Sequence, residues 1–202
     1  MSTGSVTRIL DYGVNNLNSV EKAVRHLGYN AEISPRIGDA DRLIIPGVGA
    51  FGAAMRAISP LADEIRDFVA SGRPILGICL GQQLLMDGSD EHGQTAGLGL
   101  VSGWVKYLPK SAGLKVPHMG WTEVKFVENS ELGRDVGASE CVYFVHSLYC
   151  ECSDSSMVVA TADYGITFCA ALRRENVWGT QFHPEKSGRV GLKILENFLA
   201  WN

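Results

Sequence analysis

Short runs of apolar residues alternate with regularly spaced apolar positions through the first half of the chain. A short apolar run bounded by polar residues or glycine is typical of a buried strand, whereas spaced positions are typical of an amphipathic helix. The runs that predict strands lie at residues 6–10, 29–33, 42–45 and 74–78.

The clearest helical pattern covers residues 15–27. Its apolar residues recur at intervals of three or four, so they share one face, and Gly28 follows as a stop signal. Further helices are expected over residues 61–70 and 80–87. Strands that alternate with helices in this way predict a parallel sheet covered by helices on both faces.

The second half of the chain has a different pattern, in which short strands follow one another with turns between them. A single helix over residues 189–200 ends this part. The predicted class is therefore a mixed, mainly parallel open α/β sheet with an antiparallel extension, forming one domain over residues 1–202. The later strands are expected at residues 100–108, 122–127, 142–145, 157–161, 166–172 and 177–182.

Composition narrows the range of functions. The chain is 46% apolar and 20% charged, as in an ordinary globular protein, and its net charge of −4 gives no reason to expect a nucleic-acid partner. The charge-free stretch at residues 43–55 is too short to span a bilayer and is broken by Pro46, so no membrane partner is expected.

The N-terminus and the cysteines suggest a cellular compartment. Residues 1–5 lack the charged and apolar regions of a secretory leader. The chain contains five cysteines, which is an odd number. Reduced thiols in the cytoplasm are the simplest interpretation. Cys150 and Cys152 could form a metal clip, but no second Cys or His pair stands nearby at ligand spacing. We therefore expect neither a metal nor another cofactor.

Cys79 stands at the junction between the strand 74–78 and the helix that follows it directly. Gly77 and Gly81 flank it, and a Gly-x-nucleophile-x-Gly turn of this kind exposes a catalytic Ser or Cys at a helix N-terminus. The helix dipole there favours the thiolate. The alternative is an ordinary buried cysteine at a strand end.

A partner for this thiol follows the strand 177–182. Alternate residues of an extended chain face the same way, and Pro184 keeps His183 out of the helical region. His183 and Glu185 can therefore lie together as a general base and the acid that orients it. Read alone, the segment would be a solvated loop, but with Cys79 it predicts a Cys-His-Glu triad at the carboxyl edge of the sheet.

A glycine-rich segment after the strand 42–45 has two interpretations. Gly47, Gly49 and Gly52 match the spacing of a dinucleotide-binding loop. That loop belongs after the first strand, however, and this strand is predicted to be the third. The nucleotide interpretation is therefore the weaker one.

The better interpretation of the same segment is an oxyanion hole. Gly47 and Gly49 allow the peptide at Val48 to turn its N–H toward a reacting carbonyl group. The N–H of Leu80, next to the nucleophile, would be the second donor.

Several motifs together resemble the class I (triad) glutamine amidotransferases. Along nearly its whole length the chain is similar to the HisH-type glutaminase subunits of imidazole glycerol phosphate synthase. The motifs that carry this resemblance are Asp11-Tyr12-Gly13, Pro46-Gly47-Val48-Gly49, Gly77-Ile78-Cys79-Leu80-Gly81, Pro117-His118-Met119-Gly120-Trp121, Phe144-Val145-His146-Ser147 and His183-Pro184-Glu185-Lys186-Ser187.

The resemblance implies a flavodoxin-like fold and hydrolysis of L-glutamine to glutamate and ammonia. Cys79 would form a glutamyl thioester, which water then hydrolyses, without a cofactor. The residues that match the family's glutamine contacts are Gly47, Gly49, Gln83 and Ser147.

A second protein is expected to receive the ammonia. The glutaminase motifs occupy the whole domain, and free ammonia is mostly protonated at neutral pH, so a synthase should dock here. In the resembled family the partner is a (β/α)8-barrel cyclase, which forms a heterodimer with the glutaminase for histidine biosynthesis. Apolar and aromatic character suits an interface. The interface residues expected are Pro117, His118, Met119, Trp121 and Lys186.

Other interpretations remain at this point. The chain departs from the usual family pattern at Asn15, Thr122 and Leu148, outside the expected triad. It could therefore be a paralogous glutaminase for another synthase, such as a sugar amidotransferase of surface-polysaccharide synthesis. A non-catalytic binding subunit is the third possibility, which the intact triad residues argue against. His118 and His146 have no acidic partner at triad-like spacing and are expected to be structural or interfacial.

Overall fold

One large mixed sheet forms the centre of the protein in a computed structural model that describes residues 5–110 and 114–201. The expectation that no secretory leader is present depends on residues 1–5, and the first four of these lie outside the described part. Within the described residues, no helix combines the length and the apolar character needed to cross a bilayer.

The parallel half of the sheet contains the strands predicted from the first half of the chain, together with the last strand. Each of these strands pairs in parallel with its neighbour. In spatial order they are β2 (Asn30–Ser34), β1 (Val6–Leu10), β3 (Arg42–Ile45), β4 (Ile75–Ile78) and β13 (Val177–Thr180).

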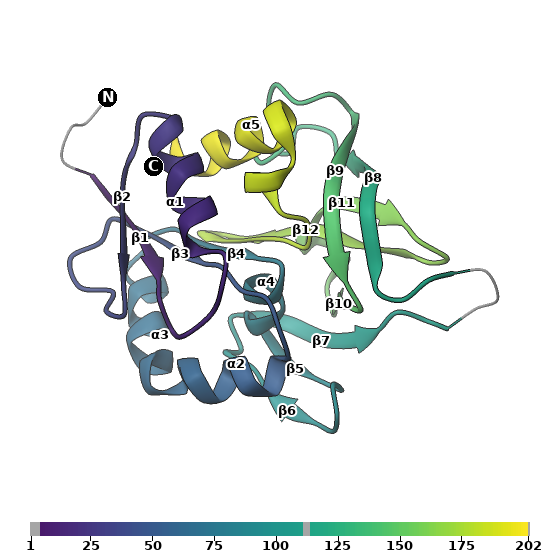
Figure 1. Cartoon of the computed structure of the whole chain (residues 1–202), viewed down its shortest axis with the longest axis horizontal. Helices are drawn as coiled ribbons and strands as arrows, with labels where there is room; N and C mark the ends of the chain where they lie inside the picture. The colour runs from purple at the N-terminus through teal and green to yellow at the C-terminus, as the bar shows by residue number, and fades with distance from the viewer. Residues whose placement is uncertain (1–4, 111–113, 202) are drawn as a thin grey trace.

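Helices cover both faces of this parallel half, as the sequence pattern predicts (Figure 1). In β3, Leu43 and Ile45 pack into one apolar cluster and Ile44 into the other, because successive side chains of a strand point to opposite faces. Helices α1 (Leu17–His26) and α5 (Gly188–Leu199) cover one face, and α2 (Phe51–Ile58) and α3 (Ala62–Ala70) cover the other.

The antiparallel extension continues the sheet beyond β13. Strands β8, β9 and β11 leave the main path of the sheet through β12, and in Figure 1 they stand on the side of the molecule away from β2. The strands of the extension are β12 (Thr167–Arg174), β10 (Leu148–Cys152), β7 (Val101–Tyr107), β5 (Met86–Ser89), β6 (Thr95–Ala96), β11 (Val158–Asp163), β8 (His118–Phe126) and β9 (Ser139–His146).

The predicted α/β class, with helices on both faces and an antiparallel extension, is confirmed. Two helices differ from the prediction. Helix α2 was not expected, because the glycine-rich loop before it dominates the local pattern, although Phe51, Met55 and Ile58 are buried at helical spacing. Helix α4 (Leu80–Leu84) is shorter than the predicted 80–87, because the chain from Met86 pairs with β7 instead.

Several strands also differ from the prediction. Strand β8 begins at His118 rather than at residue 122, and β5, β6 and β10 were not predicted. Strands β8 and β10 depend on pairing with distant strands, β8 with β9 and β11, and β10 with β7 and β12. Such pairing overrides local propensity, which is weak for short strands.

Candidate active site

Three adjacent parallel strands end at the same edge of the sheet and carry the predicted site. Strand β3 is followed by Gly47 and Val48, β4 by Cys79, and β13 by the segment that contains His183. Their order β3-β4-β13 places the segment of the nucleophile between those of the oxyanion loop and the base. The backbone N–H of Cys79 donates to the Thr180 carbonyl oxygen at 2.7 Å and fixes the nucleophile strand against the base strand.

The sharp turn predicted at Cys79 is present. Its φ of 55° and ψ of −108° lie in a region that non-glycine residues rarely occupy. A Cβ atom at Gly77 would lie 2.5 Å from the Gly81 carbonyl oxygen, and one at Gly81 would overlap the Ile45 carbonyl oxygen. The two glycines are therefore needed for close packing around the turn. The cysteine itself is only 5% exposed.

His183 and Glu185 form the expected pair. Nδ1 of His183 lies 2.8 Å from Oε1 of Glu185, and both side chains are fully buried. A carboxylate can only accept, so Nδ1 carries the proton and Nε2 of the neutral ring is left as the base. Nε2 makes no hydrogen bond of normal geometry to the described residues. Long or poorly aligned catalytic bonds are common before substrate binds.

The pKa of the His183 imidazole depends on its electrostatic interaction with the Cys79 sulfur. Burial lowers the pKa of His183, but its interactions with Cys79 and then with Glu185 raise it more strongly, and the resulting pKa is about 9. The imidazolium form is therefore favoured beside the thiol and the carboxylate. This is the arrangement that a cysteine nucleophile with a histidine base requires.

The raised pKa predicts how stability depends on pH. A group whose pKa is higher in the folded state stabilises the protein fully below its unfolded pKa of about 6.5. That contribution is lost as the pH rises through about 9. Urea unfolding between pH 6 and pH 10 should therefore show a steeper loss of unfolding free energy in the wild type than in Glu185→Gln, which lacks one cause of the shift. Equal slopes would contradict the assignment.

A cavity of about 250 Å³ opens beside the sulfur. It brings together predicted residues from separate parts of the chain. The predicted residues that lie outside its lining are Gly47, His118, Met119, Trp121, His183, Glu185 and Lys186. The residues that line it are Val48, Gly49, Cys79, Leu80, Gln83, Glu91, Pro117, Val145, His146, Ser147 and Leu148.

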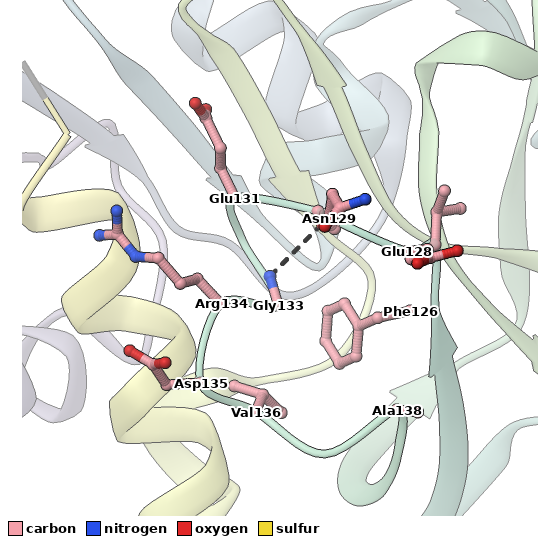
Figure 2. A pocket seen from close by; sticks show the side chains of 11 residues that line it. Phe126, Glu128, Asn129, Glu131, Gly133, Arg134, Asp135, Val136 and Ala138 are labelled. Atoms are coloured by element: carbon pink, nitrogen blue, oxygen red, sulfur yellow. Dashed lines mark hydrogen bonds between the residues drawn. The ribbon is translucent and has the colours of Figure 1, made fainter.

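A larger cavity of about 520 Å³ lies elsewhere, in the loop that follows β8 (Figure 2). Phe126 and Val136 supply apolar surface there, and the Gly133 N–H donates to the Ser130 hydroxyl across the loop. Its lining contains neither a cysteine nor a histidine and shares no residue with the Cys79 cavity. The larger cavity therefore lacks the expected catalytic side chains, and we assign the active site to the smaller cavity beside Cys79.

Gln181 was missed by sequence reasoning. Its Nε2 lies 3.7 Å from the sulfur of Cys79, and its Oε1 accepts a hydrogen bond of 3.1 Å from Nε2 of Gln83. Nε2 of Gln83 also donates to the Leu148 carbonyl oxygen at 3.2 Å. The available signal was the two-residue period of an extended chain, which puts residue 181 on the same side as His183.

Three further residues contact the site, and the sequence analysis assigned no role to any of them, although Tyr12 lies in the Asp11-Tyr12-Gly13 motif. The hydroxyl of Tyr12 donates to the Pro46 carbonyl oxygen at 2.6 Å and so holds the oxyanion loop, and burial raises its pKa. Glu91 accepts from the Phe51 N–H at 2.5 Å, where α2 begins after that loop. Asn16 donates from Nδ2 to Oε1 of Glu185 at 2.6 Å.

The two histidines of the extension form a directed chain of hydrogen bonds. Nδ1 of His146 donates to the Leu148 carbonyl oxygen at 2.7 Å, so its Nε2 accepts from Nδ1 of His118 at 3.0 Å. Nε2 of His118 then accepts from the Thr122 hydroxyl at 2.7 Å. Burial lowers the pKa of His146 to about 3 and also lowers that of His118. Neutral, buried rings of this kind suit a structural role rather than a catalytic one.

His118 therefore differs from its expected place at an interface. It is only 2% exposed and stacks on Tyr164 with ring centroids 3.9 Å apart, because it lies on the inner face of β8. Its strand neighbours Met119 and Trp121 face outward and are 63% and 58% exposed. Pro117 and Lys186 are exposed as well.

The remaining cysteines lie outside the site. All five cysteines are free, and Cys150 faces Cys169 across the β10–β12 pair. No group of three or more His, Cys, Asp or Glu residues suited to a metal ion occurs in the described ranges.

Comparison with known families shows to which family the chain belongs. Residues 8–201 match the model of the family described as glutamine amidotransferase class-I. This chain belongs to the class I glutamine amidotransferases. Relatives of this glutamine amidotransferase carry the name imidazole glycerol phosphate synthase subunit HisH. One from Methanosarcina barkeri is 48% identical over 95% of this chain and 96% of its own, and one from Acinetobacter baylyi is 41% identical over 98% and 100%. The chain is thus an amidotransferase of the HisH group.

A longer relative and two solved structures extend the comparison. The chloroplastic imidazole glycerol phosphate synthase hisHF of Arabidopsis thaliana is 45% identical over 98% of this chain, which covers 34% of that protein. PurLQS from Thermotoga maritima superposes with a TM-score of 0.75 at 20% identity, over 96% of this chain and 97% of that one. A glutamine amidotransferase from the same organism gives 0.67 at 17%, over 96% and 82%. At these identities, the structures support the fold alone.

Proposed function

We propose that this HisH-type amidotransferase hydrolyses L-glutamine at Cys79 and passes the ammonia to a cyclase partner in histidine biosynthesis. The observation that carries the proposal is the buried arrangement of Cys79, His183 and Glu185 at one edge of the sheet. The whole described chain serves this reaction as one glutaminase domain.

The chemistry divides into acylation and hydrolysis. Nε2 of His183 takes the proton of Cys79 before the sulfur attacks the amide carbon, and Glu185 stabilises the resulting imidazolium. The imidazolium then protonates the departing nitrogen, which leaves as ammonia. Water, activated by the same imidazole, hydrolyses the thioester to glutamate. The N–H groups of Val48 and Leu80 serve as oxyanion donors, each worth about 3 kcal/mol in the transition state.

The cavity residues suit the other end of glutamine, which carries an ammonium and a carboxylate group. Glu91 is the single carboxylate in the lining of the cavity and suits the ammonium. Gln83 and Ser147 offer hydrogen-bonding groups, and Gly49 allows the backbone to approach the substrate closely. Gly47 is buried and leaves room for the Tyr12 hydroxyl, so its expected contact with glutamine stays a prediction. No cofactor takes part in the proposed reaction.

The proposed partner is a (β/α)8-barrel cyclase that forms a heterodimer with this protein. The name hisHF and the length of the Arabidopsis relative, of which the match covers 34%, support a second functional part in that protein. We place the complex in the cytoplasm, without nucleic-acid or membrane partners. The sugar amidotransferase alternative is not favoured, because the named relatives are imidazole glycerol phosphate synthase proteins.

A glutaminase assay with the purified cyclase tests the proposal. Glutamate release from glutamine should be slow for the isolated protein and should rise when the cyclase, loaded with its acceptor, is added. Equal release with and without the cyclase would contradict the proposed coupling, and no release in either case would contradict the proposed activity.

Trp121→Ala tests the docking surface. Loss of a large exposed aromatic at an interface should weaken binding to the cyclase by about 10-fold or more. The matched control is Val127→Ala, because Val127 is also apolar and exposed but lies roughly 20 Å further along the strand direction. Titration calorimetry measures both dissociation constants. A Trp121→Ala complex as tight as the Val127→Ala complex would exclude this surface.

A further inference from the structure

Asn16 occupies the position that would cap helix α1, but its side chain does not cap the helix. Asparagine at this position normally accepts a hydrogen bond from an N–H of the first turn. Here the side chain makes no capping bond. Instead Nδ2 donates at 2.6 Å to Oε1 of Glu185, 169 positions away in the sequence. The helix therefore lacks its usual cap, and the triad carboxylate gains a hydrogen bond.

The backbone of Asn16 is also unusual. Its φ of 81° and ψ of 7° lie in the left-handed region, which residues other than glycine rarely occupy, although asparagine does so more readily than most. Helix α1 packs directly against the turn at Pro184–Lys186. The left-handed conformation sets the start of the helix beside this turn and leaves the amide within reach of the carboxylate.

Glu185 needs such a partner because its carboxylate is fully buried. Oε1 accepts from both Nδ1 of His183 and Nδ2 of Asn16, whereas Oε2 has no hydrogen-bond partner among the described residues. With one bond alone, the carboxylate could rotate about its link to the imidazole. The second bond, from another element, fixes its position.

The chemistry of the donor matters as much as its position. A lysine or arginine in this place would pair with Glu185 and compete with the imidazolium for its negative charge. The neutral amide of Asn16 donates a hydrogen bond and leaves that charge to His183. An uncharged, rigid donor is therefore the suitable group behind a carboxylate that must stabilise a developing cation.

We propose that Asn16 is a positioning residue that holds Glu185 in the orientation needed to bond and stabilise His183 during catalysis. This inference rests on the proposed function of the triad. Asn16 itself acts through Glu185 and is not assigned any contact with glutamine.

Asn16→Gly is the decisive variant, since glycine accepts the left-handed backbone and removes only the amide. The expected result is a fall in kcat for glutamine hydrolysis of about 10- to 100-fold, with little change in KM, because the base is no longer held in place. The matched control is Asn129→Gly, at an exposed left-handed asparagine in the loop of Figure 2. It should retain wild-type kcat. Thermal melting of both variants checks that they fold.

Titration of His183 by NMR gives a readout that does not depend on activity. The pKa of His183, about 9 in the wild type, should fall in Asn16→Gly and stay unchanged in Asn129→Gly. Wild-type kcat in Asn16→Gly, or a lower kcat with an unchanged His183 titration, would overturn the proposal. A wild-type protein that shows no glutaminase activity with the cyclase would instead refute the proposed function, so the two failures are distinguishable.

Discussion

Cys79→Ala is expected to abolish glutamine-dependent turnover of the complex with the cyclase. Without the sulfur no thioester forms, and loss of a nucleophile of this kind costs on the order of 10⁴-fold or more. Turnover with added ammonium salt should persist, because the cyclase would then take ammonia from solution. Measuring both rates in one preparation separates loss of the glutaminase from loss of the complex.

The matched control for this variant is Cys141→Ala. Cys141 is a free and exposed cysteine on β9, outside the Cys79 cavity, so its removal should leave both rates unchanged. Residual glutamine use by Cys79→Ala near the wild-type rate would show that another group is the nucleophile. A parallel loss of the ammonia-dependent rate would mean that the substitution damages the complex rather than the chemistry.

His183→Asn is expected to have the second largest effect. Asparagine keeps a hydrogen-bonding group in the buried site but cannot take the proton of Cys79, so formation of the thioester should slow by about 10³- to 10⁴-fold. Labelling of Cys79 by a glutamine-like diazoketone, followed by mass spectrometry, measures this step directly. It does so without the cyclase reaction.

His26→Asn serves as the control, because His26 is exposed in the last turn of α1. It should be labelled at the wild-type rate. Labelling of His183→Asn at that same rate would contradict the role of the imidazole as the base, even if the overall turnover were reduced.

The sequence predicts those parts of the site that depend on local patterns. The turn at Cys79 follows from the strand, the two glycines and the helix, all within the ten residues from Ile75 to Leu84. The pairing of His183 with Glu185 follows from a short segment that contains proline. The meeting of these two segments follows from a general rule, that parallel strands present their carboxyl ends at one edge of the sheet.

The parts that were missed depend on contacts between distant residues. The hydroxyl of Tyr12 reaches Pro46, 34 positions away, and the amide of Asn16 reaches Glu185. No local sequence pattern predicts either contact. The Tyr12 contact depends on the register of β1 against β3, and the Asn16 contact depends on how α1 packs against the turn after β13. The inward orientation of His118 could not be predicted for a similar reason, because only the pairing of β8 decides which side chains face inward.

The same reasoning applies to the fold. The parallel half follows from apolar runs that are buried on both faces, as in β3 and β4. The extension is harder to predict because strands such as β10 are short and are stabilised by partners on both sides. The apolar residues of helix α2 recur at helical spacing. Because of the glycines before it, however, no helix was predicted in this segment.

The near-complete burial of Cys79 has a consequence for the survival of the enzyme among reactive electrophiles. A reagent must enter a cavity of about 250 Å³ before it meets the sulfur, whereas the thiol of Cys141 is open to solvent. Bulky alkylating compounds therefore react first at a position that the chemistry does not need. Access to the cavity, together with the reactivity of the thiol, therefore limits which small molecules inactivate the protein.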